Sequence, residues 1–517
     1  MNLSSRGAAA AAFGALLIVA GLRSQAPPAF SARVTVQTEP RTPARIYLLR
    51  NGEPFRLQPV QASLPVKSDL FYRDRLWIDN PNPEVLELIC NDEYHYLLLN
   101  GRANFHLPAG RYAIEAYRGF FYTPARVEFE LKADETRTIT LPLKAWEGVR
   151  PEEWISSDDH IHLTRTQREN PVYLSWLEAE DLNVANFLAL QRQSDAAPQY
   201  AYGAAGEFAR RGYSIRSGQE TRNQSFGHIL MLGGESVVRP MSTGRELANV
   251  PDDYPFHTLL FDLARKARAL TGYAHFRERP NKSTFYMDLA LGKLDLIELF
   301  QFGVLTTEPW YELLNAGFRI TGVAGSDFPV YMQRLKPYPR WVPLLGPERA
   351  LVKKSAAQPG GFAPWAEGVR NGQAIVSNGP IVELAWANGE ARATAAFFRP
   401  LEVLEIVRNG EVVASVTGDG EKRRLSLNVK APRDGWYAAR VRARKGKDEP
   451  DIQAHTNASY PGGPVLVPEA RRAIAGRWEA EIKQYRGANL KWGSAARERE
   501  FFDTAEKALA ELRRPLR

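Results

Sequence analysis

The chain has 517 residues, of which 44% are hydrophobic, and its formal net charge is +8 at pH 7. A chain of this length is expected to form about three domains, each with its own core. Basic and acidic residues are interleaved, and the basic runs are as short as "KKS" and "EKRR". Because nucleic-acid binding usually needs a basic stripe on one face, we expect no nucleic-acid partner.

The N-terminus, "MNLSSRGAAAAAFGALLIVAGLRSQAPPAF", carries an apolar run from Ala8 to Gly21. This length is typical of a signal-peptide core and is short for a membrane-spanning helix. Small residues at 24–26 offer a cleavage point, although Pro27 directly after them is unfavourable; an uncleaved segment would be a membrane anchor. We predict a signal peptide at residues 1–26 and export to the periplasm or the cell exterior.

Residues 30–147 show the pattern of β-strands. "ARVTVQTE", "ARIYLLRNGE", "YHYLLLNG" and "ARVEFELK" alternate or run apolar, with turn residues between them. This pattern predicts an N-terminal β-sandwich domain. Cys90 is the single cysteine of the chain, so no intramolecular disulfide is expected.

Residues 150–380 alternate between helical and strand patterns. "YLSWLEAEDL" and "FHTLLFDLARKARAL" have helical spacing, and short apolar segments such as "VANFLAL", "GHILML" and "LDLIELF" lie between and after them. Strands that alternate with helices indicate parallel βα units. In a closed βα barrel the functional residues lie at the carboxyl ends of the strands.

The last part of the chain returns to strands and then to helices. In residues 381–462, "PLEVLEIVRNGEVVASV" places an Asn-Gly turn between two strand-like runs, which predicts a hairpin in a C-terminal β domain. Residues 463–517 have helical periodicity with many charges, so we expect surface helices without a functional role.

Histidines and carboxylates fall at the predicted strand ends of residues 150–380. His160 and His162 are one residue apart on a strand, which points both side chains to the same face. Imidazole and carboxylate are the ligands that suit zinc, manganese or iron, and a bridging carboxylate can hold two ions. The candidate ligands are His160, His162, Glu220, His228, His275 and Asp327. The other four histidines are expected to be structural: His95, His106, His257 and His455.

The order of these motifs resembles a known family. "HIH", then Glu220 followed by "GHI", then "AH" and "GSD" is similar to the polymerase-and-histidinol-phosphatase (PHP) metallohydrolase domain, in particular to its CehA/McbA-like branch. "WAEGVRNGQAIVSNGP", residues 365–380, is similar to a segment that closes the barrel in that branch. The resemblance implies a distorted (β/α)7 barrel, flanked here by N-terminal and C-terminal β-sandwich-like domains.

The resemblance also implies how the ligands divide between ions. His160, His162, Glu220 and Asp327 would hold the first ion. Glu220 would bridge to a second ion, which His228 and His275 complete.

The chain departs from the family pattern where a third ion would bind. Arg168 and Pro329 stand where histidines are expected, and "NFLALQRQ" replaces the usual "TDH" strand end. These departures fall on one ion site, so the resemblance implies two divalent ions, of zinc, manganese or iron. Arg192, at the end of the altered strand, either supplies positive charge in place of the missing ion or is a surface arginine.

Four further residues are candidates for roles around the ions. Asp158 and Asp159 either hydrogen-bond to ligand imidazoles or face solvent in a turn. Glu298, in "LIELF", would orient a ligand or act as a base, and Arg277 would bind an anionic substrate. We take Glu298, Arg277 and Asp159 as the catalytic candidates.

Three hypotheses for function follow. The leading one is a secreted hydrolase that uses a dinuclear, metal-activated water on a phosphoester, carboxylic ester or carbamate of a small molecule. The second is a non-catalytic secreted binding protein with a residual structural metal site. The third, an amidohydrolase, ranks lower because the sequence has no obvious bridging lysine. The oligomeric state stays open.

Overall fold

The computed structural model describes residues 31–57, 60–66, 76–80, 83–90, 93–192, 196–246, 252–276, 283–329, 340–355, 357–463 and 466–514. The segment interpreted as a signal peptide lies outside these ranges. Within them the chain is a strand-rich α/β protein with several sheets. None of the described helices combines the length and the apolar character needed to cross a membrane.

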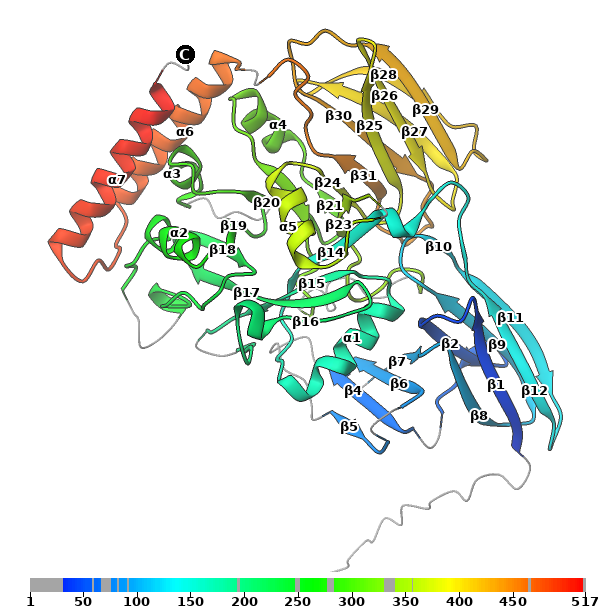
Figure 1. Ribbon diagram of the computed structural model, residues 1–517. Coiled ribbons are helices and arrows are strands. Elements are labelled where there is room, and N and C mark those ends of the chain that lie inside the picture. Colours follow the sequence, from blue (N-terminus) through cyan, green and yellow to red (C-terminus); the bar gives the residue numbers. More distant parts are fainter. Residues whose placement is uncertain are drawn as a thin grey trace, which may run out of the picture.

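The N-terminal part consists of two main sheets that share one hydrophobic core, coloured blue and cyan in Figure 1. The first sheet contains β1 (Ser31–Glu39), β8 (Arg102–Pro108) and β12 (Thr136–Pro142). The second contains β2 (Ala44–Arg50), β3 (Glu53–Pro54), β4 (Ala62–Val66), β5 (Trp77–Ile78), β6 (Val85–Cys90), β7 (Glu93–Leu99), β9 (Gly110–Tyr117) and β11 (Ala125–Leu131). Short strands β10 (Tyr122–Thr123) and β13 (Lys144–Ala145) pair beside them. Alternate residues of β1, such as Val34 and Val36, are buried between the two sheets, as strand periodicity requires.

The central part carries a curved mixed sheet covered by helices. Its strands are β14 (Trp154–Ile161), β15 (Val184–Ala189), β16 (Phe208–Arg210), β17 (Tyr213–Asn223), β18 (Gly227–Leu232), β19 (Leu270–Tyr273), β20 (Leu296–Gln301), β21 (Val304–Leu305), β22 (Thr321–Ala324), β23 (Arg349–Lys353) and β24 (Ala374–Ser377). Its helices are α1 (Asn170–Ala179), α2 (His257–Lys266), α3 (Phe285–Ala290), α4 (Glu308–Asn315) and α5 (Phe362–Arg370).

The strand directions differ in part from the parallel βα units that the sequence pattern indicates. β14, β15 and β17 are parallel, and so are β19, β20 and β22. β18 runs antiparallel to both β17 and β19, because β17 and β18 form a hairpin with no helix between them. The sheet is therefore mixed, and the hairpin carries two of the candidate ligands.

The two ends of this run of strands return to each other. Beyond β22, Phe328 forms a parallel bridge with Ile161 at the end of β14, and the amide of His162 donates to the carbonyl of Phe328. One buried apolar cluster draws residues from β14, β15, β18, β19, β20 and β22 together with α5. The carboxyl ends of β14 and β22 consequently lie side by side.

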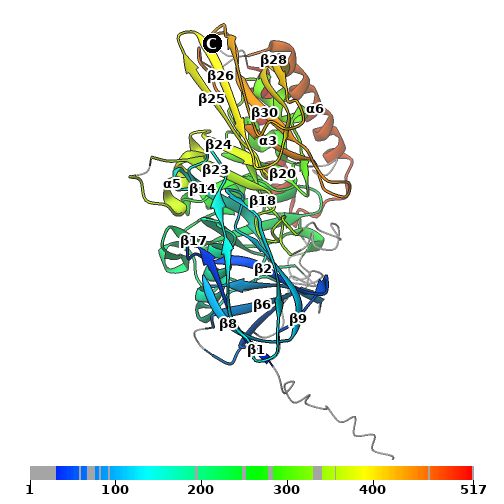
Figure 2. The same cartoon turned by 90° about the vertical axis from the view of Figure 1, so that its right-hand side faces the viewer.

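Four C-terminal strands, β31, β30, β27 and β28, extend the same sheet, because β24 pairs with β31, and β25, β26 and β29 form a separate sheet. These strands are β25 (Ile381–Ala387), β26 (Glu390–Ala396), β27 (Leu401–Arg408), β28 (Glu411–Thr417), β29 (Arg424–Lys430), β30 (Tyr437–Ala443) and β31 (Ile452–Thr456). β27 and β28 form a hairpin through Asn409 and Gly410, both with positive φ, which fits the Asn-Gly turn predicted there. Figure 2 shows the N-terminal strands, the central part and the C-terminal strands stacked along one direction.

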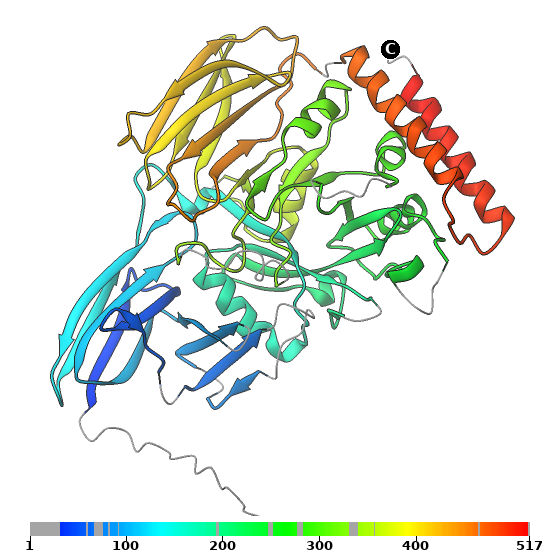
Figure 3. The same cartoon turned by 180° about the vertical axis from the view of Figure 1, so that it is seen from behind.

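Two long helices end the chain: α6 (Pro468–Arg486) and α7 (Ala495–Arg513). They pack against each other and against the central helices, as Figure 3 shows from behind. Trp478 and Phe501 are fully buried and belong to the same apolar cluster as the central residues Phe256 and Trp310. The charged periodicity of this segment therefore marks only its outer face.

Candidate metal centre

The HxH motif lies at the carboxyl end of β14, the strand whose residues are all buried. His160 is in the strand and His162 directly follows it, and both side chains have no solvent exposure. Their Nε2 atoms lie 2.9 Å apart. The strand thus directs both imidazoles to one point, as its two-residue period requires.

The other ring nitrogen of each histidine already has a hydrogen-bond acceptor. Nδ1 of His162 lies 3.1 Å from the carbonyl oxygen of Leu188, and Nδ1 of His160 lies 2.9 Å from Oε1 of Glu298. Because a carbonyl or carboxylate oxygen only accepts, each Nδ1 carries the hydrogen. In the neutral rings, the Nε2 lone pairs then face each other, an arrangement that a cation would stabilise.

Two carboxylates complete this side of the cluster. Oε2 of Glu220 lies 3.0 Å from Nε2 of His162 and 3.7 Å from that of His160. Oδ1 of Asp327 lies 3.4 Å from both of these nitrogens. Two imidazoles and two carboxylates, a donor set typical of divalent transition metals, therefore converge here.

The second oxygen of Glu220 faces a different pair of histidines. Oε1 lies 3.2 Å from Nδ1 of His228 and 3.4 Å from Nε2 of His275. Nδ1 of His275 lies 2.8 Å from Oε1 of Gln301, which leaves its Nε2 for the cluster. Glu220 stands between two sets of imidazoles, with one oxygen toward each.

Several buried acceptors of the cluster lack a hydrogen-bond donor. Among the described residues, Oε1 of Glu220, Nδ1 of His228 and Oδ1 of Asp327 have no hydrogen-bond partner. Buried polar atoms are normally paired, so acceptors without a donor that converge on one point fit a cation. Two groups have ligand atoms within 4.8 Å of one another: His160, His162 and Asp327; and Glu220, His228 and His275. The residues present therefore fit a metal site.

The charges of the cluster also favour a positive species. Burial opposes protonation of His160, but the carboxylates of Glu298 and Asp327 outweigh it and raise the pKa of His160 well above its usual value. Burial, and next the charge of Arg222, lowers the pKa of His228 to about 4. His160 therefore attracts a proton or a metal ion, whereas His228 stays neutral and able to act as a ligand.

The backbone at two of these residues has an uncommon conformation. His275 and Asp327 follow the short strands β19 and β22, with φ of 51° and 52°. A positive φ is uncommon outside glycine and costs free energy, and it often occurs at functional sites. The conformation turns both side chains back toward the strand ends.

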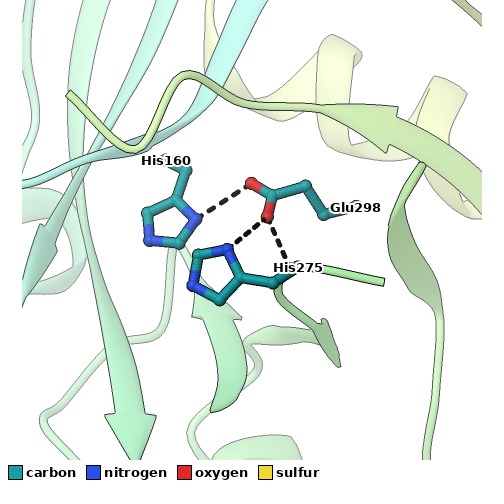
Figure 4. A group of neighbouring side chains, drawn as sticks. All are labelled: His160, His275 and Glu298. Carbon is teal, nitrogen blue, oxygen red and sulfur yellow. Dashed lines mark hydrogen bonds and ion pairs between the residues drawn. The ribbon is translucent and has the colours of Figure 1, made fainter. Parts of the chain in front are cut away.

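Glu298, on β20, lies beside His160 and His275, one histidine from each set, as Figure 4 shows. Besides its contact with Nδ1 of His160, its Oε2 accepts a hydrogen bond from the backbone amide of His275 at 2.7 Å and lies 3.5 Å from Nδ1 of that residue. The ligand atoms of these three residues also lie within 4.8 Å of one another. Because the hydrogen bonds already occupy the carboxylate, we interpret Glu298 as the group that orients the two imidazoles.

The neighbouring aspartates have different surroundings. Both are fully buried, so neither is a solvent-facing turn residue. Asp158 accepts hydrogen bonds from the amides of His160, Ser326 and Gly346 and from the Ser326 hydroxyl. It ties β14 to the segment after β22 and touches no ligand imidazole. Asp159 accepts a hydrogen bond at its Oδ1 from the Ser157 hydroxyl at 2.7 Å.

Of the remaining candidates, Arg168, Arg192 and Pro329 are among the described residues. Arg277 is outside the described residues. Arg168 is exposed, and Arg192 is half-buried beyond β15. Pro329 is buried next to Phe328, and its ring offers no ligand atom.

The four histidines expected to be structural lie outside the cluster. His257 contacts the Tyr273 hydroxyl at 3.4 Å, and His455 contacts the Tyr311 hydroxyl at 2.5 Å. His95 and His106 are on strands of the N-terminal sheets.

Two residues of the site were missed from the sequence. Arg222 places its guanidinium 2.7 Å from Oε2 of Glu220, and Gln301 contacts Nδ1 of His275. A signal for Arg222 was present, because it follows Glu220 by two positions on one strand and so shares its face. Gln301 ends β20, three residues after Glu298.

Comparison with known proteins identifies no family for this chain. No family model matches the sequence, and a search of curated proteins finds no match. What is shown is a buried group of histidines and carboxylates that could hold metal ions.

Proposed function

We propose that this protein is a metal-dependent hydrolase with a dinuclear centre. The observation that carries the proposal is the position of Glu220, whose two carboxylate oxygens face separate pairs of imidazoles. His160 and His162, with Asp327, would hold one divalent ion. His228 and His275 would hold the other, with Glu220 shared between the two.

The donor set supports zinc, manganese or iron, since imidazole and carboxylate ligands suit all three. When bound, two such ions supply an acidified water and positive charge that offsets the charge developing on a substrate oxygen. A phosphoester, a carboxylic ester and a carbamate of a small molecule all fit this chemistry. In this proposal no nucleic acid is a partner.

The protein's own groups hold the ligands in place. Glu298 fixes the ring orientation of His160 and the backbone of His275, and Asp158 fixes the strand end that carries His160. The side chains of His228 and His275 are 27% and 11% exposed, whereas His160, His162 and Glu220 are fully buried. Substrate and water would therefore reach the cluster from the His228 side.

The fold proposal is a distorted βα barrel of the PHP type, close to the CehA/McbA-like branch. The bridge between Ile161 and Phe328, and the apolar cluster shared by strands of the central sheet, support closure of the strands. In this proposal residues 150–380 form the barrel, residues 30–147 and 381–462 form flanking β domains, and residues 463–517 form a helical segment. The proposal also includes export of the protein, directed by a signal peptide at residues 1–26.

The test counts metal ions and measures hydrolysis on the same preparation. The purified mature chain is expected to hold close to two ions and to hydrolyse an aryl phosphodiester or an aryl ester. His160→Ala is expected to lose bound metal and activity together, whereas His106→Ala, at an exposed histidine of β8, is expected to keep both. Full turnover by metal-free protein would refute the proposal.

One observation favours a second candidate function. Three ligands are fully buried, as befits an ion that only stabilises the fold. A chain that holds its ions but hydrolyses neither substrate, with or without added manganese, would be a secreted binding protein with a structural metal site.

A further inference from the structure

Arg222 carries a fixed positive charge at the bridging carboxylate. It lies on β17, two residues after Glu220 and on the same face, and only 5% of its surface is exposed. Its Nε and one terminal nitrogen each lie 2.7 Å from Oε2 of Glu220. Arginine stays protonated at all ordinary pH values, so this charge is permanent.

The guanidinium contacts one oxygen of Glu220, Oε2. Oε2, which Arg222 contacts, is the oxygen that faces His162 at 3.0 Å. Oε1 faces His228 and His275 and has no hydrogen-bond partner among the described residues. One ion site therefore shares its carboxylate oxygen with a guanidinium, and the other does not.

We propose that Arg222 lowers the affinity of the ion site formed by His160, His162 and Asp327, so that the ion bound there is the exchangeable one. This inference rests on the proposed dinuclear function. A guanidinium and a divalent ion on the same oxygen repel each other, and in partly buried surroundings such repulsion exceeds a factor of ten in affinity. The site of His228 and His275 lies on Oε1, and there the ion would share no oxygen with the guanidinium.

A purely orienting role for Arg222 predicts the opposite sign. If its hydrogen bonds served only to hold Glu220 in its bridging position, their removal would weaken both ion sites. The direction of the change in affinity therefore separates the two roles.

The experiment removes metal from the full chain with a chelator and then titrates the chain with zinc. Calorimetry follows the titration, and a competing chelator brings tight affinities into the measurable range. The wild-type chain is expected to show two classes of site. In Arg222→Gln the weaker class is expected to tighten by at least about tenfold and the tighter class to change by less than about threefold. Arg222→Lys, which keeps the charge, is expected to stay within about threefold of wild type.

Two comparisons assign the classes and control for the substitution. His162→Ala is expected to remove the weaker class and His228→Ala the tighter one. Arg216→Gln changes another arginine of β17, whose ion-pair partner is Glu207 at 2.8 Å, and is expected to leave both affinities unchanged. Thermal unfolding of each metal-free variant shows whether it folds. Arg222→Met replaces Arg222→Gln if the glutamine variant does not fold.

Three results would overturn the inference. The first is that the weaker class of zinc site keeps its affinity or loses affinity in Arg222→Gln or Arg222→Met. The second is that His228→Ala removes the weaker class. The third is that the weaker class tightens in Arg222→Lys as much as it does in the glutamine variant. Failure of the proposed function looks different: the wild-type chain would then either lack two classes of zinc site or bind zinc without hydrolysing either substrate.

Discussion

Glu298 accepts a hydrogen bond from Nδ1 of His160 at 2.9 Å, although 138 positions separate the two residues in the sequence. The same carboxylate accepts from the backbone amide of His275. A single buried side chain on β20 thus sets the geometry of one imidazole from each half of the cluster. A carboxylate in this position also makes the attached imidazole a stronger ligand.

We therefore expect Glu298→Gln to lower metal affinity by about 10–100-fold while the protein stays folded. Glutamine keeps the size of the side chain but removes its charge and one acceptor, so the two histidines lose their common anchor. Zinc titration of the metal-free chain measures the effect.

The matched control is Glu348→Gln. Burial raises the pKa of Glu348 to about 8, so this neighbouring acid is already neutral at pH 7, and its Oε1 accepts from the amide of Gly303. Its glutamine variant is expected to bind zinc as the wild type does. Equal losses in the two variants would show that any substitution of a buried acid disturbs the site.

Asp158 and Asp159 are adjacent but are expected to respond differently to the same substitution. Asp158→Asn places an amide group against the backbone and hydroxyl donors that Asp158 now accepts from, and is expected to cost about 2–4 kcal/mol of unfolding free energy. Burial raises the pKa of Asp159 well above its usual value, which makes loss of its charge less costly, and Asp159→Asn is expected to cost less than about 1 kcal/mol. Urea denaturation measures both.

Asp159→Asn also separates two hypotheses for that residue. A catalytic Asp159, as taken from the sequence, predicts loss of hydrolysis with metal retained. A structural Asp159, held by its hydrogen bond from Ser157, predicts that hydrolysis persists. Measured turnover of the variant decides between them.

Part of the site could be predicted from the sequence, because strand periodicity is a local property. The single residue between His160 and His162 suffices to place both on one face of a buried strand. Interpreting Glu220 as a strand-end residue was less accurate, since it lies inside the long strand β17. The end of β17 consists largely of buried polar residues, so the sequence has no apolar alternation there from which the length of the strand could be predicted.

The remaining contacts depend on which strand ends meet, and this is not a local property. Asp158 was expected to face an imidazole or solvent, yet its partners are backbone groups near residue 326 and at Gly346. Likewise Gln301 acquires a role only because β20 lies beside β19. The alternation of strands and helices indicated parallel pairing. β18 is antiparallel because a short turn joins it to β17, and the alternation gave no sign of that turn.

Arg45 and Glu180 form a buried ion pair that joins the N-terminal strands to the end of α1. Nε of Arg45 lies 2.8 Å from Oε1 of Glu180, with both side chains at most 1% exposed. Glu180→Gln leaves the Arg45 charge without its carboxylate and is expected to cost about 3–5 kcal/mol. Urea denaturation measures the loss.

The exposed pair of Arg472 and Glu469 provides the comparison. Glu469→Gln breaks an ion pair whose side chains are both about two-thirds exposed, and is expected to leave the denaturation midpoint unchanged. A similar midpoint shift in both variants would mean that the buried pair contributes no more than a surface one.

His455 is expected to make stability depend on pH. Burial lowers its pKa to about 4 from the ordinary 6.5, and the neutral ring accepts from the Tyr311 hydroxyl and donates from Nδ1 to the carbonyl of Thr456. The unfolded chain binds the proton more readily, so the contribution of His455 is complete above pH 6.5. It decreases as the pH falls from 6.5 toward 4, by about 3 kcal/mol in total.

The measurement is the unfolding free energy of wild type and His455→Gln in urea at several pH values from 4 to 7. Glutamine has no titratable group, so the difference between the two proteins is expected to grow with pH by about 3 kcal/mol across this window. Titration of the other buried histidines occurs in both proteins and cancels in the difference. The control is His106→Gln, at an exposed histidine, whose unfolding free energy is expected to change with pH as that of the wild type does. If the unfolding free energy of His455→Gln also changed with pH as that of the wild type does, burial of this ring would not couple folding to pH.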